Sequence, residues 1–381
     1  MTKNLMDYSD LKPRQCCSLS ILLLLCLLFN ACSAPTGTTP VSSGEDSLST
    51  HDQVNQTEKT TSYPPILLDF DSTPVLKTAM VTSRSGAIFR QGCSEKAVPL
   101  GTYDYGTKLD IVEDAGDWWG VRERIGRTFV ENDVEIERSA WEKVYVKKGE
   151  TGSSSEIALS AADLYHYTYL ELADKSKQNE QKKRLQDYLD LALIDKATFD
   201  QQKKESVRFF HADSTRFQQR SGTLWLPTTQ GDGISLHDRI TDGDDQVEYG
   251  YLGHIDILDA FVVSGSFYEM YRVFLFNRTT GEQMGAFDEF PHLSADKNHI
   301  LTLAANPYET TGDLALYRVE GTSIQLLFTI GFTHWMPESG DRGFWGKDGN
   351  FYTPVNHKDV FWKENGMLND HFQYLRIHPV R

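Results

Sequence analysis

Cysteine and positive charge are both scarce in this sequence. Five cysteines in 381 residues are too few for the disulfide-rich scaffolds of small secreted domains. Lysine and arginine number 38 against 54 aspartates and glutamates, which gives a formal net charge of −16. Because binding to nucleic acid needs clustered basic side chains, this balance argues against a nucleic-acid partner. Hydrophobic residues make up 39% of the chain, so it is globular, and its length predicts about two or three domains.

The apolar run near the N-terminus is too short to span a bilayer comfortably. It covers residues 21–29, which is about 14 Å as an α-helix. Lys3, Lys12 and Arg14 precede it and small residues follow it, a pattern typical of a secretory signal. We therefore predict a signal peptide over residues 1–31.

The signal ends in Ala31-Cys32-Ser33, where a small residue precedes a cysteine. This junction resembles the acylation box of bacterial lipoproteins, which implies that Cys32 becomes the lipid-modified N-terminus of the mature chain. An ordinary cleaved signal, in which Cys32 is incidental, is the alternative. Residues 32–63 are rich in Ser, Thr, Gly and Pro and are predicted to form a flexible tether. The resemblance implies a protein of the bacterial cell envelope that is lipid-anchored and faces the periplasm or the exterior.

The lipid is the only membrane contact that we expect. Loss of residues 1–31 leaves 35 basic against 52 acidic residues, a net charge of −17, so nothing attracts the mature chain to an anionic membrane. The same cleavage and the acylation account for four cysteines and leave Cys93 alone in the folded part. An intramolecular disulfide is therefore excluded, and Cys93 is not expected to act as a nucleophile.

Short strand-like runs separated by turn residues begin after residue 76. Their spacing of about 8–12 residues predicts a small β-barrel or sandwich. Leu109 and Ile111 alternate with Lys108 and Asp110, which gives the strand one buried and one solvent-exposed face. The predicted strands are residues 78–82, 87–90, 108–112, 118–122 and 127–130.

Three segments of this region carry a family resemblance. Residues 100–112 place a Gly-Thr pair before an alternating strand, Gly116-Asp117-Trp118 opens the next strand, and Gly126 leads into residues 127–130. Together they resemble the bacterial SH3-like domain, which implies an SH3-like β-barrel domain over residues 64–150. In that family such domains are commonly linked to the binding of cell-wall material or of proteins.

Four aromatic residues of this domain are the candidate ligand-binding residues. Strand alternation sends one of Trp118 and Trp119 inward and the other outward. Together with Tyr103 and Tyr105, the outward one predicts an aromatic platform for a peptide or a glycan. The alternative is that these rings pack on neighbouring loops.

Helix-like spacing of apolar residues follows the β module. Alanines, leucines and tyrosines form two stripes within residues 158–172 and 185–194, and residues 195–199 begin a third short segment. We therefore predict a helical connector over residues 151–215.

Strand-like runs return in residues 216–381 and predict a second, β-rich domain, so the whole chain is mainly β. A strand at residues 271–276, the turn Leu293-Ser-Ala-Asp296 and a strand at residues 314–318 resemble β-propeller blades. Because two or three such units are fewer than a closed propeller needs, we expect an incomplete propeller or an antiparallel sandwich. The predicted strands are residues 223–226, 247–251, 260–263, 271–276, 299–303, 314–318, 323–330, 343–345 and 374–377.

Signatures of catalysis and of metal binding are mostly missing. The chain has no His-Glu-x-x-His, Cys-x-x-Cys, Gly-x-Ser-x-Gly or phosphate-loop pattern. His254 and Asp256 share a strand face, and residues 242–245 concentrate carboxylates, but a surface hydrogen-bonded pair and a tight turn explain both patterns better than a metal site. Ser294 and Lys297 match Ser-x-x-Lys without its companion motifs, which favours a turn. We predict no catalytic residue, metal ligand or cofactor.

The leading hypothesis is a non-enzymatic, lipid-anchored envelope protein that binds peptidoglycan or another envelope protein. One alternative is a cell-wall hydrolase or amidase that the SH3-like domain delivers to its polymer. Another is a periplasmic inhibitor or immunity lipoprotein, whose net charge of −17 matches a basic target.

Overall fold

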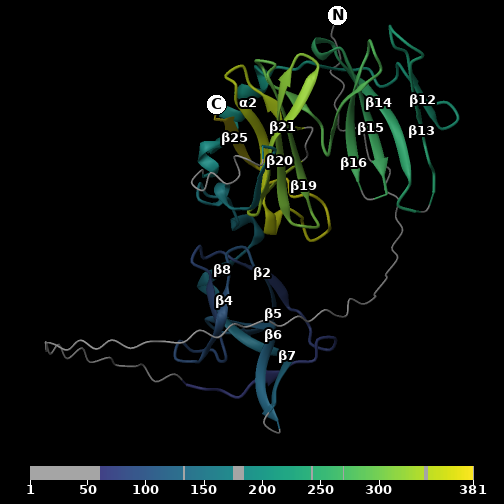
Figure 1. Cartoon of the computed structure of the whole chain (residues 1–381). Coiled ribbons are helices and arrows are strands. Elements are labelled where there is room, and N and C mark those ends of the chain that lie inside the picture. The colour runs from purple at the N-terminus through teal and green to yellow at the C-terminus, as the bar shows by residue number, and fades with distance from the viewer. Residues whose placement is uncertain are drawn as a thin grey trace, which may run out of the picture. The chain divides into compact units, whose positions relative to one another are not determined.

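The computed structural model describes residues 61–131, 134–174, 184–241, 243–268, 270–338 and 342–380. The predicted signal peptide, Cys32 and the tether up to residue 60 lie outside the described residues. Antiparallel sheets dominate, and the one α-helix in the described part of the chain is α2 (Lys196–Lys204), so the predicted mainly β class is confirmed (Figure 1). Residues 58–381 form one compact unit.

The first eight strands form one antiparallel sheet, which we call the N-terminal sheet. Its order is β4-β3-β7-β6-β5-β2-β8, with β1 on β7. Side chains of six strands pack on one another in a single core, so the sheet curls around that core while its edge strands β4 and β8 stay unpaired with each other. The strands are β1 (Ile66–Leu67), β2 (Lys77–Val81), β3 (Ala87–Arg90), β4 (Pro99–Tyr103), β5 (Lys108–Ala115), β6 (Trp118–Glu131), β7 (Val134–Lys147) and β8 (Thr151–Gly152).

Four of the five strands predicted in this region coincide with β2, β3, β5 and β6, whereas β1, β4, β7 and β8 were not predicted. Leu109 and Ile111 are buried, whereas Lys108 is exposed and Asp110 half-buried, as their alternation indicates. A separate strand at residues 127–130 is wrong. Those residues belong to β6, whose pairing with β7 runs without a register shift from Trp118 to Glu131.

The predicted helical connector is also wrong. Residues 151–215 contain α2 but otherwise consist of short turns and the strands β9 (Tyr167–Leu172), β10 (Leu189–Ile194) and β11 (Phe210–Ala212). β9 pairs with β21 and β10 pairs with β25, so contacts with residues far along the chain outweigh the local spacing of apolar side chains. The third segment is helical as predicted, because Asp195 caps α2 by accepting a hydrogen bond from the Thr198 amide at 2.7 Å.

Three antiparallel sheets and one hairpin make up the rest of the chain. Their orders are β11-β14-β15-β16-β17, then β18-β19-β20-β21-β9, which we call the cleft sheet, and β10-β25-β24-β22 with β23 on β24, the C-terminal sheet (Figure 1). The strands are β12 (Thr223–Leu226), β13 (Ile234–His237), β14 (Val247–Ile255), β15 (Ala260–Phe267), β16 (Tyr271–Asn277), β17 (Gln283–Phe287), β18 (His292–Leu293), β19 (His299–Asn306), β20 (Thr311–Glu320), β21 (Ser323–Phe332), β22 (Trp335–Pro337), β23 (Phe344–Trp345), β24 (Phe351–His357) and β25 (Gln373–Pro379).

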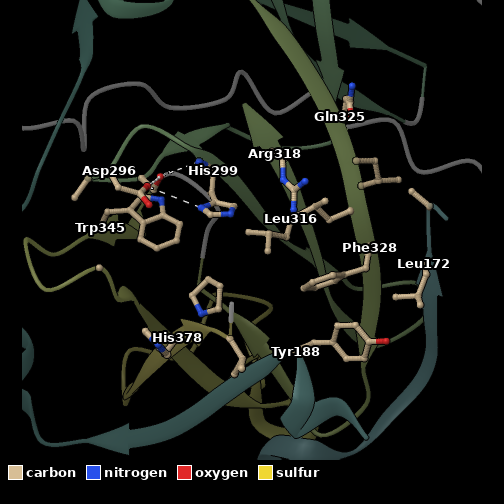
Figure 2. Close-up of a pocket in the computed structure, with 18 of the residues that line it drawn as sticks. Leu172, Tyr188, Asp296, His299, Leu316, Arg318, Gln325, Phe328, Trp345 and His378 are labelled. Carbon is tan, nitrogen blue, oxygen red and sulfur yellow. Dashed lines mark hydrogen bonds and ion pairs between the residues drawn. The ribbon is translucent and has the colours of Figure 1, made fainter. Parts of the chain in front are cut away.

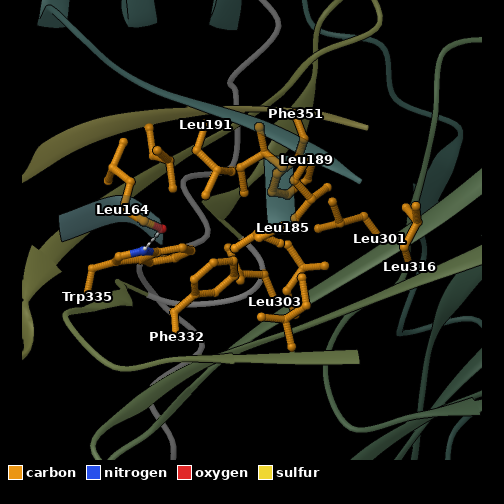
Figure 3. Close-up of a cluster of buried hydrophobic side chains, with 14 of the residues drawn as sticks. Leu164, Leu185, Leu189, Leu191, Leu301, Leu303, Leu316, Phe332, Trp335 and Phe351 are labelled. Atoms are coloured by element: carbon orange, nitrogen blue, oxygen red, sulfur yellow. Dashed lines mark hydrogen bonds between the residues drawn. The ribbon is translucent and has the colours of Figure 1, made fainter. Parts of the chain in front are cut away.

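All nine strands predicted after residue 216 coincide with observed strands to within a few residues, but the predicted domain boundary at residue 216 is misplaced. β9 and β10 lie at the edges of the cleft sheet and the C-terminal sheet, so these sheets begin well before that residue. The largest core crosses the same boundary (Figure 3). In it Leu164 and Leu189 are buried with Phe332 and Trp335, and the Trp335 indole N–H donates to the Leu164 carbonyl at 3.3 Å.

Two turns of the N-terminal sheet, which contain Arg84 and Tyr105-Gly106, contact residues 156–163 and 357–360, and we call this contact region the junction. Tyr105 packs with Met80, Ile157 and Val360 in a small apolar cluster. The Tyr105 hydroxyl accepts a hydrogen bond from the Ala158 amide at 2.8 Å. The junction is therefore built from apolar packing and from polar groups that are already paired.

Candidate ligand-binding cleft

The four candidate aromatic residues do not gather into an exposed platform. Tyr103 and Trp118 are buried, and the Tyr103 hydroxyl donates to Glu123 Oε2 at 2.8 Å. Trp119 is half-buried, and its indole N–H donates to Thr151 Oγ1 at 3.1 Å. Tyr105 lies in the junction, so the predicted platform is replaced by packing within the fold.

Trp119 is also covered by positive charge. The ammonium groups of Lys77 and Lys148 each lie 3.9 Å from the centre of its ring system, a distance typical of cation–π contacts. The indole that a stacking ligand would need is thus contacted by two of the protein's own side chains. Trp118 is the more buried of the two tryptophans, and alternation within one strand gives no information about the lysines that contact Trp119.

His254 and Asp256 lie together as their spacing predicts. His254 Nε2 is 3.4 Å from Asp256 Oδ1, and His254 Nδ1 is 3.4 Å from Asp213 Oδ1. Arg278 also binds Asp256, at 2.6 Å, and its guanidinium lowers the pKa of that carboxyl. Among the residues that the structure describes, no group of His, Cys, Asp or Glu is arranged to hold a metal ion.

The other candidate motifs form turns. Ser294 Oγ donates to Asp296 Oδ1 at 2.5 Å and accepts from the His299 amide at 2.9 Å, which fixes the turn between β18 and β19. In the acidic segment 242–245, residue 242 lies outside the described part, and Asp245 accepts a hydrogen bond from Thr241 at 2.7 Å. Cys93 is exposed. No helix in the described ranges has the length and apolar character to cross a membrane.

A cleft of about 870 Å³ opens between the cleft sheet and the end of the C-terminal sheet (Figure 2). One wall is the face formed by β19, β20, β21 and β9. The opposite wall consists of Tyr188, Trp345, the turn after β23 with Lys347 and Asp348, and residues 378–380. The volume is in the range of sites for small ligands.

Strand register arranges the cleft sheet into a polar row and an apolar row. His299 lies opposite Arg318, and Arg318 opposite Gln325, so three side chains from β19, β20 and β21 share one face at the rim. The next row on that face is apolar and buried. It consists of Leu301, Leu316, Phe328 and Leu172, which are matched in the same register.

The aromatic residues of the opposite wall are held in place by the fold. Trp345 is buried, and its indole N–H donates to the His292 carbonyl at 2.9 Å. Tyr188 contacts Phe328 edge to face with ring centres 5.6 Å apart, and its carbonyl accepts from the Val380 amide at 2.8 Å. The apolar end of the cleft is therefore rigidly formed from both walls.

Three aspartates line the cleft, and two of them, Asp296 and Asp348, are held by their own turns. Burial acts to raise the pKa of Asp296, but hydrogen bonds from Ser294 and Asn298 outweigh it and leave that pKa below its usual value. Asp348 shows the same balance, because hydrogen bonds from Tyr352 at 2.6 Å and Asn350 at 2.7 Å overcome the effect of burial and lower its pKa. Both groups are ionised at neutral pH.

Reading the sequence did not identify the cleft. It did predict the turn at residues 293–296, which supplies part of one wall, but it gave no sign that Arg318 and Gln325 share a site. Their pairing depends on a bulge between Leu316 and Tyr317 that shifts the register by one residue. No family model, curated protein or solved structure matches the chain.

Proposed function

We propose that the chain is a lipid-anchored binding protein of the bacterial cell envelope that holds a fragment of peptidoglycan in the cleft. Cys32 carries the lipid and residues 32–63 act as the tether. The cleft carries this proposal, because an apolar inner row beneath a polar rim suits a ligand with apolar and polar parts. The signal sequence and the resemblance to SH3-like domains support the envelope and the cell wall as the setting.

The N-terminal sheet serves in this proposal as the SH3-like domain. Its single curled antiparallel sheet around one small core is compatible with that family. The later sheets are compatible with propeller-type repeats, since β14 to β17 and β18 to β21 each run as an antiparallel meander. A tether of about 30 residues reaches about 30 Å on average, which lets these domains stand off the membrane.

The ionisation of the cleft carboxylates favours binding over hydrolysis. A glycosidase needs one carboxyl group whose pKa is raised so that it can donate a proton to the leaving group. Asp296 and Asp348 instead have lowered pKa values and are held by hydrogen bonds from their own turns. Clearing of cell wall in a zymogram by the purified protein would contradict this part of the proposal.

Sedimentation with purified sacculi tests the function directly. The full-length chain, extracted in detergent, is expected to sediment with sacculi, and Gln325→Trp should weaken that binding about tenfold by filling the rim of the cleft. Gln283→Trp is the matched control, because Gln283 is an equally exposed strand residue in β17 that does not line the cleft. Absence of sedimentation, together with capture of an envelope protein, would replace peptidoglycan by a protein partner.

Metabolic labelling with palmitate tests the anchor. The wild-type chain should incorporate the label and Cys32→Ala should not, because acylation of the mature N-terminus needs that thiol. Cys93→Ala is the control, since its thiol is the exposed one of the described part and lies far along the sequence from the signal. Unchanged labelling of Cys32→Ala would refute the anchor without bearing on the cleft.

A further inference from the structure

Two side chains of the polar row at the rim of the cleft, Arg318 and Gln325, present hydrogen-bond donors that the fold leaves largely uncommitted. Arg318 makes one ion pair, with Glu320 at 3.9 Å, and both side chains are more than half exposed. The side chain of Gln325 is exposed and makes no hydrogen bond within the described part of the chain. In Figure 2 the guanidinium of Arg318 lies beside His299 and above the apolar side chains of Leu316 and Phe328.

The opposite wall adds one more positive charge, that of Lys347, and the imidazole of His378. Lys347 and His378 line the cleft, are exposed, and have no carboxylate within 4.0 Å among the residues described. Of the three aspartates that line the cleft, Asp296 and Asp348 differ from these donors, since each already accepts two or more hydrogen bonds from nearby residues. The charged donors that remain available to a ligand are thus Arg318 and Lys347, on a chain whose net charge is −16.

Arginine is well suited to one particular ligand group. Its planar guanidinium donates two parallel hydrogen bonds to a carboxylate, and such charge-assisted pairs are about twice as strong as neutral ones. An amide donor next to it, as in Gln325, can complete the coordination of the same oxygens. The buried side chains of Leu316 and Phe328 line the cleft below it and offer an apolar surface to a small apolar group attached to that carboxylate.

We propose that the cleft recognises the free carboxylate of a short peptide, with Arg318 and Gln325 binding the carboxylate and with the adjoining apolar side chain lying on Leu316 and Phe328. This inference rests on the proposed function and names the part of the ligand that the cleft binds. That part is the stem peptide of peptidoglycan and not its glycan. A stem peptide that ends in alanine has both features, a carboxylate and a methyl group.

Calorimetric titration with two matched probes tests the proposal. The probes are one soluble disaccharide–tetrapeptide of peptidoglycan and the same molecule with its peptide carboxylates converted to carboxamides. The full-length chain in detergent should bind the acid form about tenfold or more tightly than the amide form. Arg318→Gln should remove that preference, Arg318→Lys should keep part of it, and Arg220→Gln, at an exposed arginine that does not line the cleft, should leave it unchanged.

The possible outcomes distinguish a failure of this inference from a failure of the proposed function on which it rests. Equal binding of both probes, or a preference that survives in Arg318→Gln, would overturn carboxylate recognition and leave peptidoglycan binding intact. No binding of either probe, with no sedimentation on sacculi, would overturn the proposed function itself. Because Arg318 is exposed, circular dichroism of the variants should match the wild type, so a lost preference reports on binding.

Discussion

The rim of the cleft and the junction are both rich in charged and polar side chains, but they differ in what those side chains already bind. At the rim, Arg318 and Gln325 are exposed and nearly free of partners. At the junction, Arg84 pairs with Asp163 at 2.6 Å and also donates to the Ala158 carbonyl, while its guanidinium lies 3.9 Å from the centre of the Tyr105 ring.

This difference separates polar groups that hold the fold from polar groups that are open to a ligand. A donor that is already paired at the junction must lose that hydrogen bond before it can bind a ligand. The free energy lost with the old hydrogen bond is about as large as the free energy gained from the new one. A donor at the rim gives up only its hydrogen bonds to water when it binds a ligand. Substitutions should therefore cost stability at the junction and affinity at the cleft.

The largest loss of stability is expected for Gly106→Ala in the junction. Gly106 has φ of +84°, and a Cβ there would lie 2.6 Å from Asp359 Oδ2 and 3.0 Å from His357 Cε1. Backbone strain and overpacking together should lower the free energy of unfolding by about 3 kcal/mol, measured by urea denaturation. Gly116→Ala is the control, because Gly116 has φ of +71° but open space around a Cβ, and only about 1–2 kcal/mol is expected there. Equal losses would mean that the junction is not tightly packed.

Acid should weaken the junction through His357. Burial lowers the pKa of His357 to about 4, against the attraction of Asp359, whereas an unfolded chain has the ordinary value of 6.5. Below about pH 6.5 His357 is therefore protonated in the unfolded chain, whereas in the folded chain it stays neutral down to about pH 4. The contribution of His357 is fully present above that window and falls by about 2 kcal/mol between pH 7 and pH 5.

Denaturation curves across this pH range check the expectation. His357→Gln should flatten the pH dependence of the unfolding free energy between pH 7 and pH 5. His371→Gln should not, because His371 is exposed. The charged groups around the His357 imidazole are Asp359 and Lys358 on its own segment, and Asp163 and His334 from the elements against it. An unchanged slope in His357→Gln would assign the acid sensitivity to those neighbours.

How far the sequence predicted this fold depended on whether the relevant contacts are local. The burial of Leu109 and Ile111 follows from alternation within one strand, and the turn at residues 293–296 is predicted from its residue types. Leu189 and Leu191 were assigned to a helix from local spacing, although they pair with Pro379 and Ile377 at the far end of the chain. Pairing between strands that lie nearly two hundred residues apart in the sequence cannot be predicted from the local spacing of apolar residues.

The candidate site was harder to predict than the fold for the same reason. Trp118 and Trp119 were sensible candidates by residue type, but their burial depends on how the whole sheet curls. Arg318 and Gln325 were ordinary surface residues by every local criterion. They become a site only through the register of three strands and one bulge.

A smaller effect is expected at the ion pair of the junction. Arg84→Gln removes the bond to Asp163, whose side chain is 13% exposed and also accepts from the Ser160 amide at 2.6 Å. Loss of a charge-assisted pair of this burial should lower the free energy of unfolding by about 1–2 kcal/mol, measured by urea denaturation. A loss no greater than that of Arg220→Gln would show that Asp163 is satisfied by Ser160 alone.

The smallest change in stability is expected for the same substitution at the cleft. Arg318→Gln removes an ion pair of 3.9 Å between two exposed side chains, and pairs of that kind contribute little because water and salt screen them. The free energy of unfolding should therefore stay within about 0.5 kcal/mol of the wild type, even though the variant loses its preference for the acid form of the muropeptide. A loss as large as that of Arg84→Gln would mean that Arg318 holds the cleft sheet together. The rim would then be a second structural contact like the junction, and the difference between the two regions would disappear.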